Sequence, residues 1–230
     1  MATGLNARDR RTLEAMLASL IRPVEVWAFL DDRPDSVEVA EILRITADLA
    51  QGRLIVRLLG DGAHPLARIL TKDRRPVLWV LGPNGEFLPI EIVGPPRGYQ
   101  FGALVRLLIN VSRNRNDLPH GVAGLIRGVP LDVQLEVRVT PTCPHSPQVV
   151  RVAEACALAN PGRIVARVID ISSSSAGGCD SLQVVPQLLI AVEGQTVTQH
   201  IGMVSAWDVG RMIMSGVKGA TRRVRDITHN

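Results

Sequence analysis

The sequence predicts an α/β protein made of two similar units in tandem, each with a mixed four-stranded sheet flanked by helices. Three observations lead to this prediction. The chain has 230 residues, which is enough for two domains of about 100 residues each. Short strand-patterned runs alternate with helix-patterned segments along its length. The same order of segments occurs twice, and the second copy follows the first at a nearly constant offset.

The repeat is clearest at the turn that follows the first predicted strand of each half. Pro34 and Ser36 in the first half correspond to Pro144 and Ser146 in the second, and both pairs are 110 positions apart. Each turn follows a short strand-like run and precedes a helix-patterned segment. Matched turns, strands and helices at one offset are hard to obtain by chance, so the two halves are predicted to share one topology.

Each half is predicted to contain, in order, a leading helix, a strand, a helix after the turn, three further strands and a closing helix. Pro76 and Pro186, again 110 positions apart, open the third strand of each half. We expect this order to place helices on both faces of each sheet. The polar segment 112–119, which ends in proline, puts the boundary between units 1–115 and 116–230. In the first unit the predicted ranges are 8–21 for the leading helix, 24–30 for the first strand, 36–50 for the second helix, 53–59 for the second strand and 101–113 for the closing helix. In the second unit the corresponding ranges are 120–127, 133–139, 146–159, 163–170 and 206–217.

Composition and charge exclude several functional classes. Hydrophobic residues make up 46% and charged residues 21% of the chain, which is typical of a globular protein, and with 3% aromatics the core must consist mainly of Val, Leu, Ile and Ala. The net charge of +4 comes from scattered residues and not from a basic face with interleaved aromatics, so nucleic-acid binding is not expected. No stretch approaches the ~20 apolar residues of a membrane span, and the N-terminus lacks the apolar run of a secretory signal. We therefore expect a cytoplasmic protein that binds neither nucleic acid nor membrane.

Three cysteines, an odd number, do not make a disulfide framework, which favours a reducing compartment and directs attention to each thiol separately. Cys143 is predicted to lie where a strand ends and a helix begins. Pro144 is expected to be the first helical residue, where its missing N–H costs nothing. The unpaired N–H groups and partial positive charge of a helix N-terminus stabilise a thiolate, and His145 and Ser146 are expected to donate further hydrogen bonds to the sulfur. An inert turn cysteine is the alternative interpretation of Cys143.

The other two cysteines have weaker indications of function. Cys156 lies within a predicted helix on an apolar stripe, where a small buried hydrophobe is the expected role. Cys179 follows a Ser-rich stretch and is expected to be an exposed loop cysteine, with a distant resolving thiol as the alternative. The sequence has no glycine motif for phosphate or dinucleotide binding, so no cofactor is expected. The five histidines have no ligand-pair spacing, so no metal site is predicted; they are His64, His120, His145, His200 and His229.

The Cys-Pro turn at 143–144, followed by a strand-opening proline at 186, is similar to the active site of thioredoxin and glutaredoxin. The tandem form resembles, more specifically, the two-unit protein disulfide oxidoreductases of bacteria and archaea, which are glutaredoxin-like, and the N-terminal domain of the alkyl hydroperoxide reductase flavoprotein. This likeness implies two thioredoxin-like units, the first of which has lost its redox cysteines at Arg33-Pro34-Asp35-Ser36. It covers about residues 5–220 and is carried by LEAMLASLIRPVEVWAFLDD, RRPVLWVL, GPPRGYQFGALVRLL, VTPTCPHSPQVVRVAEACALANP and VVPQLLIAV.

The resemblance also implies roles for the residues around Cys143. Pro186 is expected to be a cis proline beside the cysteine turn, and Val185 is expected to present its backbone N–H and C=O to an extended substrate. Thr142 belongs to the same substrate-binding edge. These families carry a second cysteine in the turn, whereas this sequence has Ser146 there. A single thiol permits attack on a disulfide but no release by a neighbour, so we expect a monothiol mechanism of thiol–disulfide exchange.

Release of the resulting mixed disulfide is then expected to need an external thiol, a partner protein or Cys179. The expected partners are protein or small-molecule thiols and disulfides of the glutathione type, together with a peroxiredoxin, as the likeness to the flavoprotein domain implies. The second hypothesis is a non-catalytic binding module, in which the strand edges at Pro76 and Pro186 hold a peptide or a partner protein. Formation of an adduct between Cys143 and glutathione disulfide distinguishes the two hypotheses.

Overall fold

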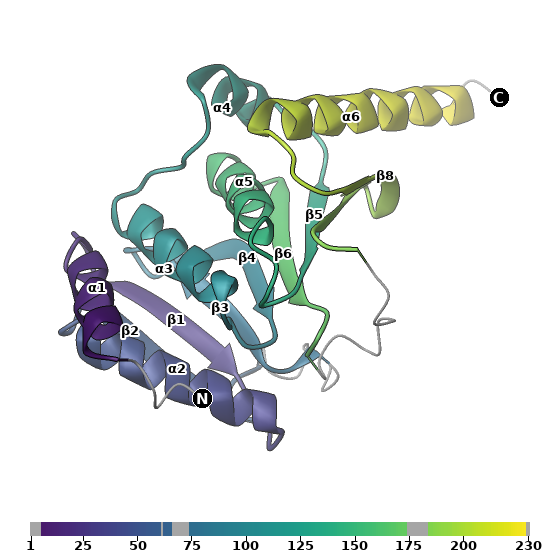
Figure 1. The fold of residues 1–230 in the computed structure, drawn as a ribbon. Coiled ribbons are helices and arrows are strands. Elements are labelled where there is room, and N and C mark those ends of the chain that lie inside the picture. The colour runs from purple at the N-terminus through teal and green to yellow at the C-terminus, as the bar shows by residue number, and fades with distance from the viewer. Residues whose placement is uncertain (1–5, 61, 66–73, 174–183, 229–230) are drawn as a thin grey trace.

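The computed structural model describes residues 6–60, 62–65, 74–173 and 184–228, except for the side chains of 223–228 (Figure 1). Its helices are α1 (Ala7–Leu17), α2 (Pro34–Leu49), α3 (Tyr99–Ser112), α4 (His120–Arg127), α5 (Ser146–Ala159) and α6 (Ala206–Thr228). Its strands are β1 (Val24–Phe29), β2 (Leu54–Leu59), β3 (Val77–Leu81), β4 (Phe87–Val93), β5 (Val133–Val139), β6 (Ile164–Asp170), β7 (Gln187–Val192) and β8 (Gln195–Ile201). Each predicted helix and strand is present, and α6 continues well past its predicted end at residue 217.

The two halves have the same strand order and the same pairing. In the first half β1 pairs in parallel with β2 and antiparallel with β3, and β3 pairs antiparallel with β4. In the second half β5, β6, β7 and β8 repeat this arrangement in that order. The prediction of two mixed four-stranded sheets in tandem is therefore confirmed.

The halves join through a parallel pairing of β4 with β6, which aligns Ile90 with Ala166 and Val93 with Ile169. The result is one sheet of eight strands in the order β2-β1-β3-β4-β6-β5-β7-β8. Joining the units in this way removes one free strand edge from each, and free edges are the parts of a sheet most exposed to unwanted pairing. The sequence did not predict this union, since the repeat describes each unit separately.

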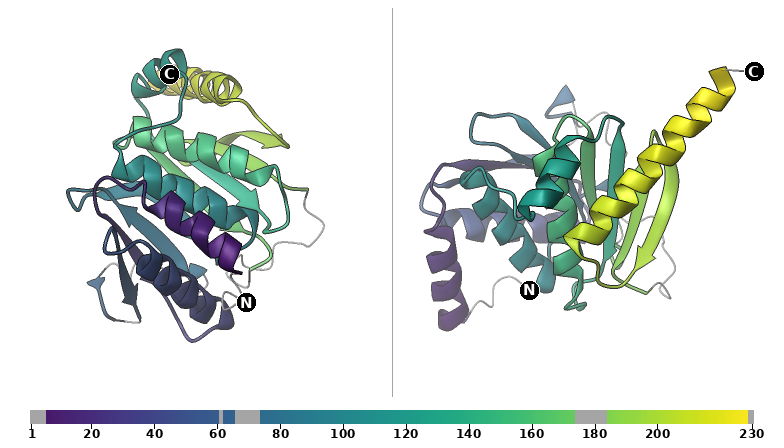
Figure 2. Two further views of the ribbon diagram at one scale, coloured as in Figure 1. Left: turned by 60° about the vertical axis from the view of Figure 1, so that its left-hand side comes forward. Right: turned by 90° about the horizontal axis from the view of Figure 1, so that it is seen from above.

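All six described helices lie on one face of the sheet, so none of these helices occupies the second face, where helices were also expected (Figure 2). Strand residues alternate between the two faces, and β5 shows this as buried and half-buried positions in strict turn. The inward residues of every strand share one core with the apolar side chains of the helices. The opposite face of the first unit carries a separate small cluster around Phe29, Val77 and Val93. The crossover helices α2 and α5 have the same handedness, and in one continuous sheet this puts both on the same face.

The position of α5 within this helical layer differs from that of α2. α5 packs between α3 and α4 over the centre of the sheet, whereas α2 lies at the end of the layer beside α1 (Figures 1 and 2). The helix that follows Cys143 is therefore buried on both flanks. None of the helices in the described ranges is long and apolar enough to cross a membrane.

Candidate functional site

Cys143 lies in the turn between β5 and α5. β5 ends at Val139, which is buried, and the chain then leaves the sheet through a turn in which the Cys143 N–H donates to the carbonyl of Thr140 at 3.4 Å. Cys143 itself is half-buried, while its neighbours Thr142, Pro144 and His145 are exposed. The thiol is thus carried at the end of a core strand with exposed residues on either side of it.

The helix after this turn begins at Ser146, so the prediction that Pro144 is its first residue is wrong. The reason is the proline that follows Ser146, as a comparison with the first unit shows. In the first unit the N–H of Val37 donates to the carbonyl of Arg33 at 3.2 Å and closes the first turn of α2. The corresponding residue of the second unit is Pro147, which has no N–H to donate to Cys143. α5 therefore starts later, and Cys143 lies three positions before its first residue.

The Ser146 side chain is buried and makes no hydrogen bond to the Cys143 sulfur. Ser146 is fully buried, and its Oγ has no hydrogen-bond partner among the described residues, so the predicted hydrogen bond to Cys143 is absent. The matching residue Ser36 is satisfied, because its Oγ donates to Asp31 at 2.7 Å and accepts the Asp31 N–H at 3.1 Å. Pro141 replaces that aspartate in the second unit and offers neither group. Ser146 thus fills the second-cysteine position without a hydrogen bond to any residue that the structure describes.

Cys143, Val185 and Pro186 come together as predicted. The Cys143 thiol donates to the Val185 carbonyl at 3.7 Å, and the bond from Val185 to Pro186 is cis. No acceptor among the described residues takes the Val185 N–H, and the preceding Val184 is 63% exposed. The sulfur therefore faces a short stretch of backbone that offers a donor and an acceptor and that reaches the surface.

The outcome for the other two cysteines differs. Cys156 has no exposed surface, and burial raises the pKa of its thiol to about 12. Its predicted role as a small buried hydrophobe is confirmed, since a thiol that stays protonated and covered does not react. Cys179 lies outside the described residues, so its suggested resolving role stays a prediction.

The first unit holds an arginine where the second unit holds its cysteine. The Arg33 guanidinium donates to the carbonyl of Arg75 at 2.6 Å and pairs with Asp31 at 2.7 Å. The bond from Arg75 to Pro76 is cis, so this carbonyl corresponds to that of Val185. The second hypothesis expected the edge at Pro76 to hold a peptide, but its carbonyl is already taken by a side chain of the same chain.

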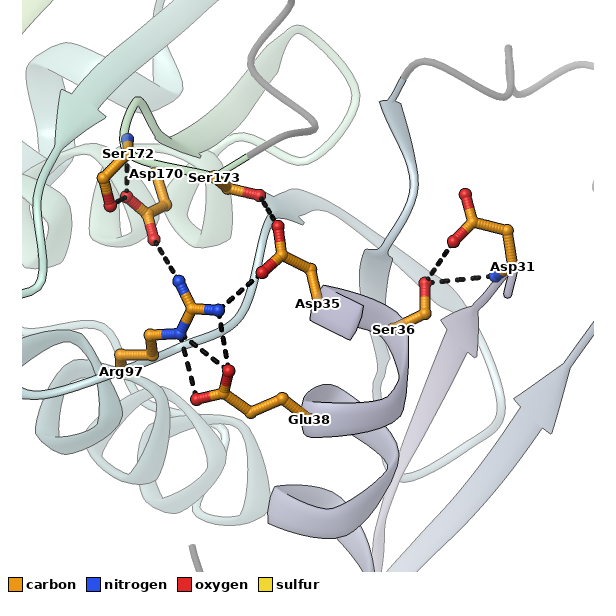
Figure 3. Close-up of polar contacts among 8 residues, drawn as sticks. All are labelled: Asp31, Asp35, Ser36, Glu38, Arg97, Asp170, Ser172 and Ser173. Carbon is orange, nitrogen blue, oxygen red and sulfur yellow. Dashed lines mark hydrogen bonds and ion pairs between the residues drawn. The ribbon is translucent and has the colours of Figure 1, made fainter. Parts of the chain in front are cut away.

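A charged cluster that the sequence did not indicate joins the two units near this site (Figure 3). Arg97, from the segment between β4 and α3, contacts both carboxylate oxygens of Glu38 at 2.7–2.9 Å and also binds Asp35. Asp35 in turn accepts a hydrogen bond at 2.7 Å from Ser173 of the second unit. The Arg97 guanidinium also reaches a buried carboxylate at the end of β6, Asp170, at 4.0 Å. Local sequence patterns do not reveal such a cluster, because its members lie far apart in the chain.

The pKa values within this cluster move in the directions that its geometry requires. The hydrogen bonds that Arg97 donates to Glu38 and Asp35 raise the pKa of Arg97 above its ordinary value, against some desolvation. Burial raises the pKa of Asp170, although the hydroxyl and N–H of Ser172 and the charge of Arg97 act in the opposite direction. Within the described ranges no group of three or more His, Cys, Asp or Glu residues is placed to hold a metal ion.

The repeated sheet order, the half-buried cysteine after a core strand and the cis proline beside it define two thioredoxin-like units in tandem. No family model matches the sequence. Among curated proteins, the chain is 28% identical over 166 residues to the alkyl hydroperoxide reductase AhpF of Escherichia coli, a match that covers 72% of this chain and 30% of that protein. The AhpF of Pseudomonas aeruginosa is 26% identical over 157 residues, which cover 68% of this chain and 28% of that protein. The chain thus spans less than a third of the length of these relatives.

Solved structures show the same fold. A structure of the alkyl hydroperoxide reductase AhpF from Enterococcus faecalis superposes with a TM-score of 0.78 at 24% identity, covering 91% of this chain and 99% of that chain. A protein disulfide oxidoreductase from Aeropyrum pernix superposes with a TM-score of 0.75 at 21% identity, covering 94% and 95% of the two chains. The chain therefore resembles both groups that its sequence suggested, and it shares their tandem thioredoxin fold.

Proposed function

We propose that this protein is a thiol–disulfide oxidoreductase of the thioredoxin type that works through a single cysteine, Cys143. One observation carries the proposal. The half-buried Cys143 sulfur lies 3.7 Å from the Val185 carbonyl, beside cis-Pro186 and a Val185 N–H that no acceptor in the described ranges takes. A backbone donor and acceptor next to a thiol are what an extended disulfide substrate needs in order to pair as an added strand while its sulfur meets the cysteine.

The reaction is an exchange in which no oxidant or reductant is consumed within the protein. The Cys143 thiolate attacks one sulfur of a substrate disulfide, the S–S bond breaks, and the other substrate sulfur leaves as a thiolate. An external thiol then attacks the mixed disulfide at the substrate sulfur and frees Cys143. Because Ser146 has no sulfur, the second step belongs to an external thiol, a partner protein or Cys179.

The surrounding residues are given roles that follow from their positions. Val185 and Pro186 form the edge that binds substrate, and the exposed Thr142 and Pro144 lie on either side of the attacking sulfur. The exposed His145 is next to the turn and is suited to give a proton to the leaving thiolate. Ser146 occupies the place of a resolving cysteine, so the mixed disulfide is not resolved from within this turn.

The curated relatives supply the proposal for a partner. They carry the name of an alkyl hydroperoxide reductase, so we infer that the physiological client is a peroxiredoxin-type component of a peroxide-reducing system. Glutathione and other small thiols are the proposed releasing agents. A reducing compartment such as the cytoplasm would hold Cys143 as a thiol between reactions.

The test is to incubate the protein with glutathione disulfide and to weigh it intact by mass spectrometry. We expect one glutathione adduct on Cys143 that is removed by excess dithiothreitol. The adduct is expected to be absent from Cys143→Ser and present in Cys179→Ser, which is the matched control because it makes the same substitution at a different thiol. A wild-type protein that remains unmodified while it stays folded would contradict the proposal.

A binding module without catalysis is the second candidate, and Ser146 is the observation that favours it. In that case the edge at Pro186 holds a partner and Cys143 has no exchange activity. The edge at Pro76 is not included, since Arg33 occupies the Arg75 carbonyl. Partner binding that survives Cys143→Ser, together with the absence of a glutathione adduct on the wild type, would favour this candidate.

A further inference from the structure

The segment between β4 and α3 presses against the second unit at two places that flank the cysteine turn. Gly94 has a φ of +91°, and a Cβ there would lie 3.0 Å from the Cβ atoms of both Asp170 and Ser173. Gly98 has a φ of +52°, and a Cβ there would collide with the carbonyl oxygen of Pro141. Only glycine fits these two positions without strain, because the backbone lies in the left-handed region and the neighbouring unit lies in the way.

The same segment holds the cysteine turn directly. The N–H of Tyr99 donates to the carbonyl of Pro141 at 3.1 Å, and Pro141 precedes Cys143 by two residues. Tyr99 is the first residue of α3, so its N–H has no partner within the helix and is free to bind outside it. A first-unit backbone group therefore fixes one end of the second-unit turn that presents the thiol.

Arg97 lies immediately before Gly98 and is held by carboxylates of both units. Its guanidinium chelates Glu38 of α2 and binds Asp35, and it faces Asp170 at the end of β6 (Figure 3). Charge-assisted contacts of this kind are short, directional and stronger than neutral hydrogen bonds. Removing the arginine would take away the guanidinium that contacts all three of these carboxylates, which are largely out of water. The segment that carries Gly98 and Tyr99 would then lose its attachment.

We propose that Arg97 is a positioning residue for Cys143, acting through Gly98 and Tyr99 on the Pro141 carbonyl. The inference rests on the proposed function, since it assigns to the first unit the task of aiming the thiol of the second. It also gives a use to Asp35 of the first-unit turn Arg33-Pro34-Asp35-Ser36. Asp35 holds Arg97 and Ser173 together across the boundary between the units.

The test compares Arg97→Met and Arg97→Lys with the wild type in three measurements: capture of glutathione from glutathione disulfide by Cys143, alkylation of Cys143 by iodoacetamide, and exchange of the Tyr99 amide proton by NMR. In Arg97→Met we expect capture to slow about tenfold, because a displaced sulfur loses its alignment with the disulfide. Alkylation, which needs only access, is expected to rise about threefold as the half-buried thiol is freed. The Tyr99 amide is expected to exchange about tenfold faster. Lysine keeps the charge but not the chelating geometry, so Arg97→Lys should fall between the two.

Two controls separate positioning from general damage. Arg57→Met removes an arginine that pairs with Glu25 at the far edge of the first unit and is expected to change none of the three measurements. Cys156 is a reporter of the core, and its alkylation would reveal global loosening. If Arg97→Met makes Cys156 reactive toward iodoacetamide, the same three measurements on the milder Arg97→Lys variant decide whether Arg97 positions the turn.

The outcomes distinguish this inference from the proposed function. If the wild-type protein captures no glutathione, the proposed function is contradicted. The effect of Arg97→Met on the alkylation rate of Cys143 and on the exchange rate of the Tyr99 amide then still decides whether Arg97 positions the turn. The inference would be overturned if capture, alkylation and Tyr99 amide exchange in a folded Arg97→Met protein all stayed within about 1.5-fold of the wild type. Such a change is too small to reflect a displaced sulfur.

Discussion

Arg33 lies in the turn after β1, and Cys143 lies at the matching position of the turn after β5. Both side chains reach the carbonyl that precedes a cis proline: Arg33 donates to Arg75 at 2.6 Å and Cys143 to Val185 at 3.7 Å. The arginine contact is a short charge-assisted hydrogen bond, further held by Asp31, whereas the thiol contact is long and weak. The first edge is therefore closed by the chain itself, whereas the second is held only weakly and is the edge at which we propose that a substrate binds.

The two turns also differ in what they do for the rest of the fold. The first contributes Asp35 to the cluster that joins the units, and its Ser36 is satisfied by Asp31. The second contributes no charged side chain to that cluster and leaves Ser146 without a partner among the described residues. Duplication has thus produced one copy that stabilises the assembly and one copy that presents a thiol, and the predictions below test this division.

The largest effect is expected from restoring a second sulfur to the open turn. In Ser146→Cys, made in a Cys179→Ser background, the new thiol takes the position that the resemblance assigns to a second cysteine, and we expect it to attack the mixed disulfide on Cys143 from within the protein. Release of glutathione without added thiol is expected to be about a hundredfold faster than in the Cys179→Ser parent, because the attacking group no longer has to diffuse to the site. Single-turnover release followed by mass spectrometry measures it. An adduct as long-lived as that of the parent would mean that position 146 does not occupy the resolving site.

A second comparison concerns the helices that follow the two turns. Position 44 of α2 is an exposed arginine, whereas the matching position of α5 is Glu154, which is 3% exposed and whose Oε1 has no hydrogen-bond partner in the described part of the chain. Burial raises the pKa of Glu154 well above its ordinary value, while the charge of Arg151 opposes the shift only in part. The difference follows from the place of α5 between two other helices.

Glu154→Gln is therefore expected to stabilise the protein at neutral and alkaline pH. The raised pKa means that the folded protein binds a proton that the unfolded chain releases, so wild-type stability falls as pH rises from the ordinary glutamate pKa toward the raised one. The gain from Glu154→Gln should be near zero at pH 4 and should grow as the pH rises above the ordinary glutamate pKa, because the wild type loses stability over that range. Urea unfolding at a series of pH values measures it, with Arg44→Gln as the matched control at the exposed position. A pH-independent difference would show that the carboxyl is not the cause.

Sequence reasoning recovered the parts of this molecule that repeat locally. Two copies of the same alternation of periods 2 and 3.6 identified every helix and strand that the structure describes. The cis bond before Pro186 was expected from the resemblance, and the cis bond before Pro76 lies at the matching position of the repeat. The predicted range of α5, 146–159, agrees with the structure, but the separate expectation that Pro144 is its first residue was wrong, although the cause, Pro147, was visible in the sequence. The union of the sheets through β4 and β6 was not predicted, because it depends on which strand edges meet in space.

The cluster around Arg97 shows the other limit of sequence reasoning. It brings together Asp35, Arg97 and Asp170, and no spacing in the sequence distinguishes these charges from others on the surface. Only the fold shows that they are enclosed between the units. The main residues of the candidate site, Cys143, Val185 and Pro186, were expected from a turn motif together with the resemblance to thioredoxin-fold proteins, but the support that the first unit provides was not expected.

The two serines of the repeat offer a closely matched pair of substitutions. Ser36→Ala is expected to cost about 1 kcal/mol of stability, because it leaves the Asp31 N–H and carboxylate without the hydroxyl that serves both. Ser146→Ala is expected to cost nothing or to stabilise slightly, because the deleted hydroxyl is buried and makes no hydrogen bond to a described residue. Thermal unfolding of the two variants measures the difference. Equal losses would mean that Ser146 has a partner after all, and the division between the turns would be weaker than proposed.

The smallest effect is expected from opening the closed edge with Arg33→Met. In the wild type, burial of Asp31 is outweighed by hydrogen bonds from Arg33 and Ser36, which lower its pKa. Stability from this pair is therefore present above the ordinary aspartate pKa and is lost as pH falls through the lowered one. Arg33→Met should lose about 0.5–1 kcal/mol at neutral pH, since the pair is partly exposed, and should lose less on acidification than the wild type. Urea unfolding at pH 7 and pH 3 measures both. If the variant were destabilised equally at the two pH values, the arginine would act only by packing against the Arg75 carbonyl, and the charge would not explain why the first edge is closed.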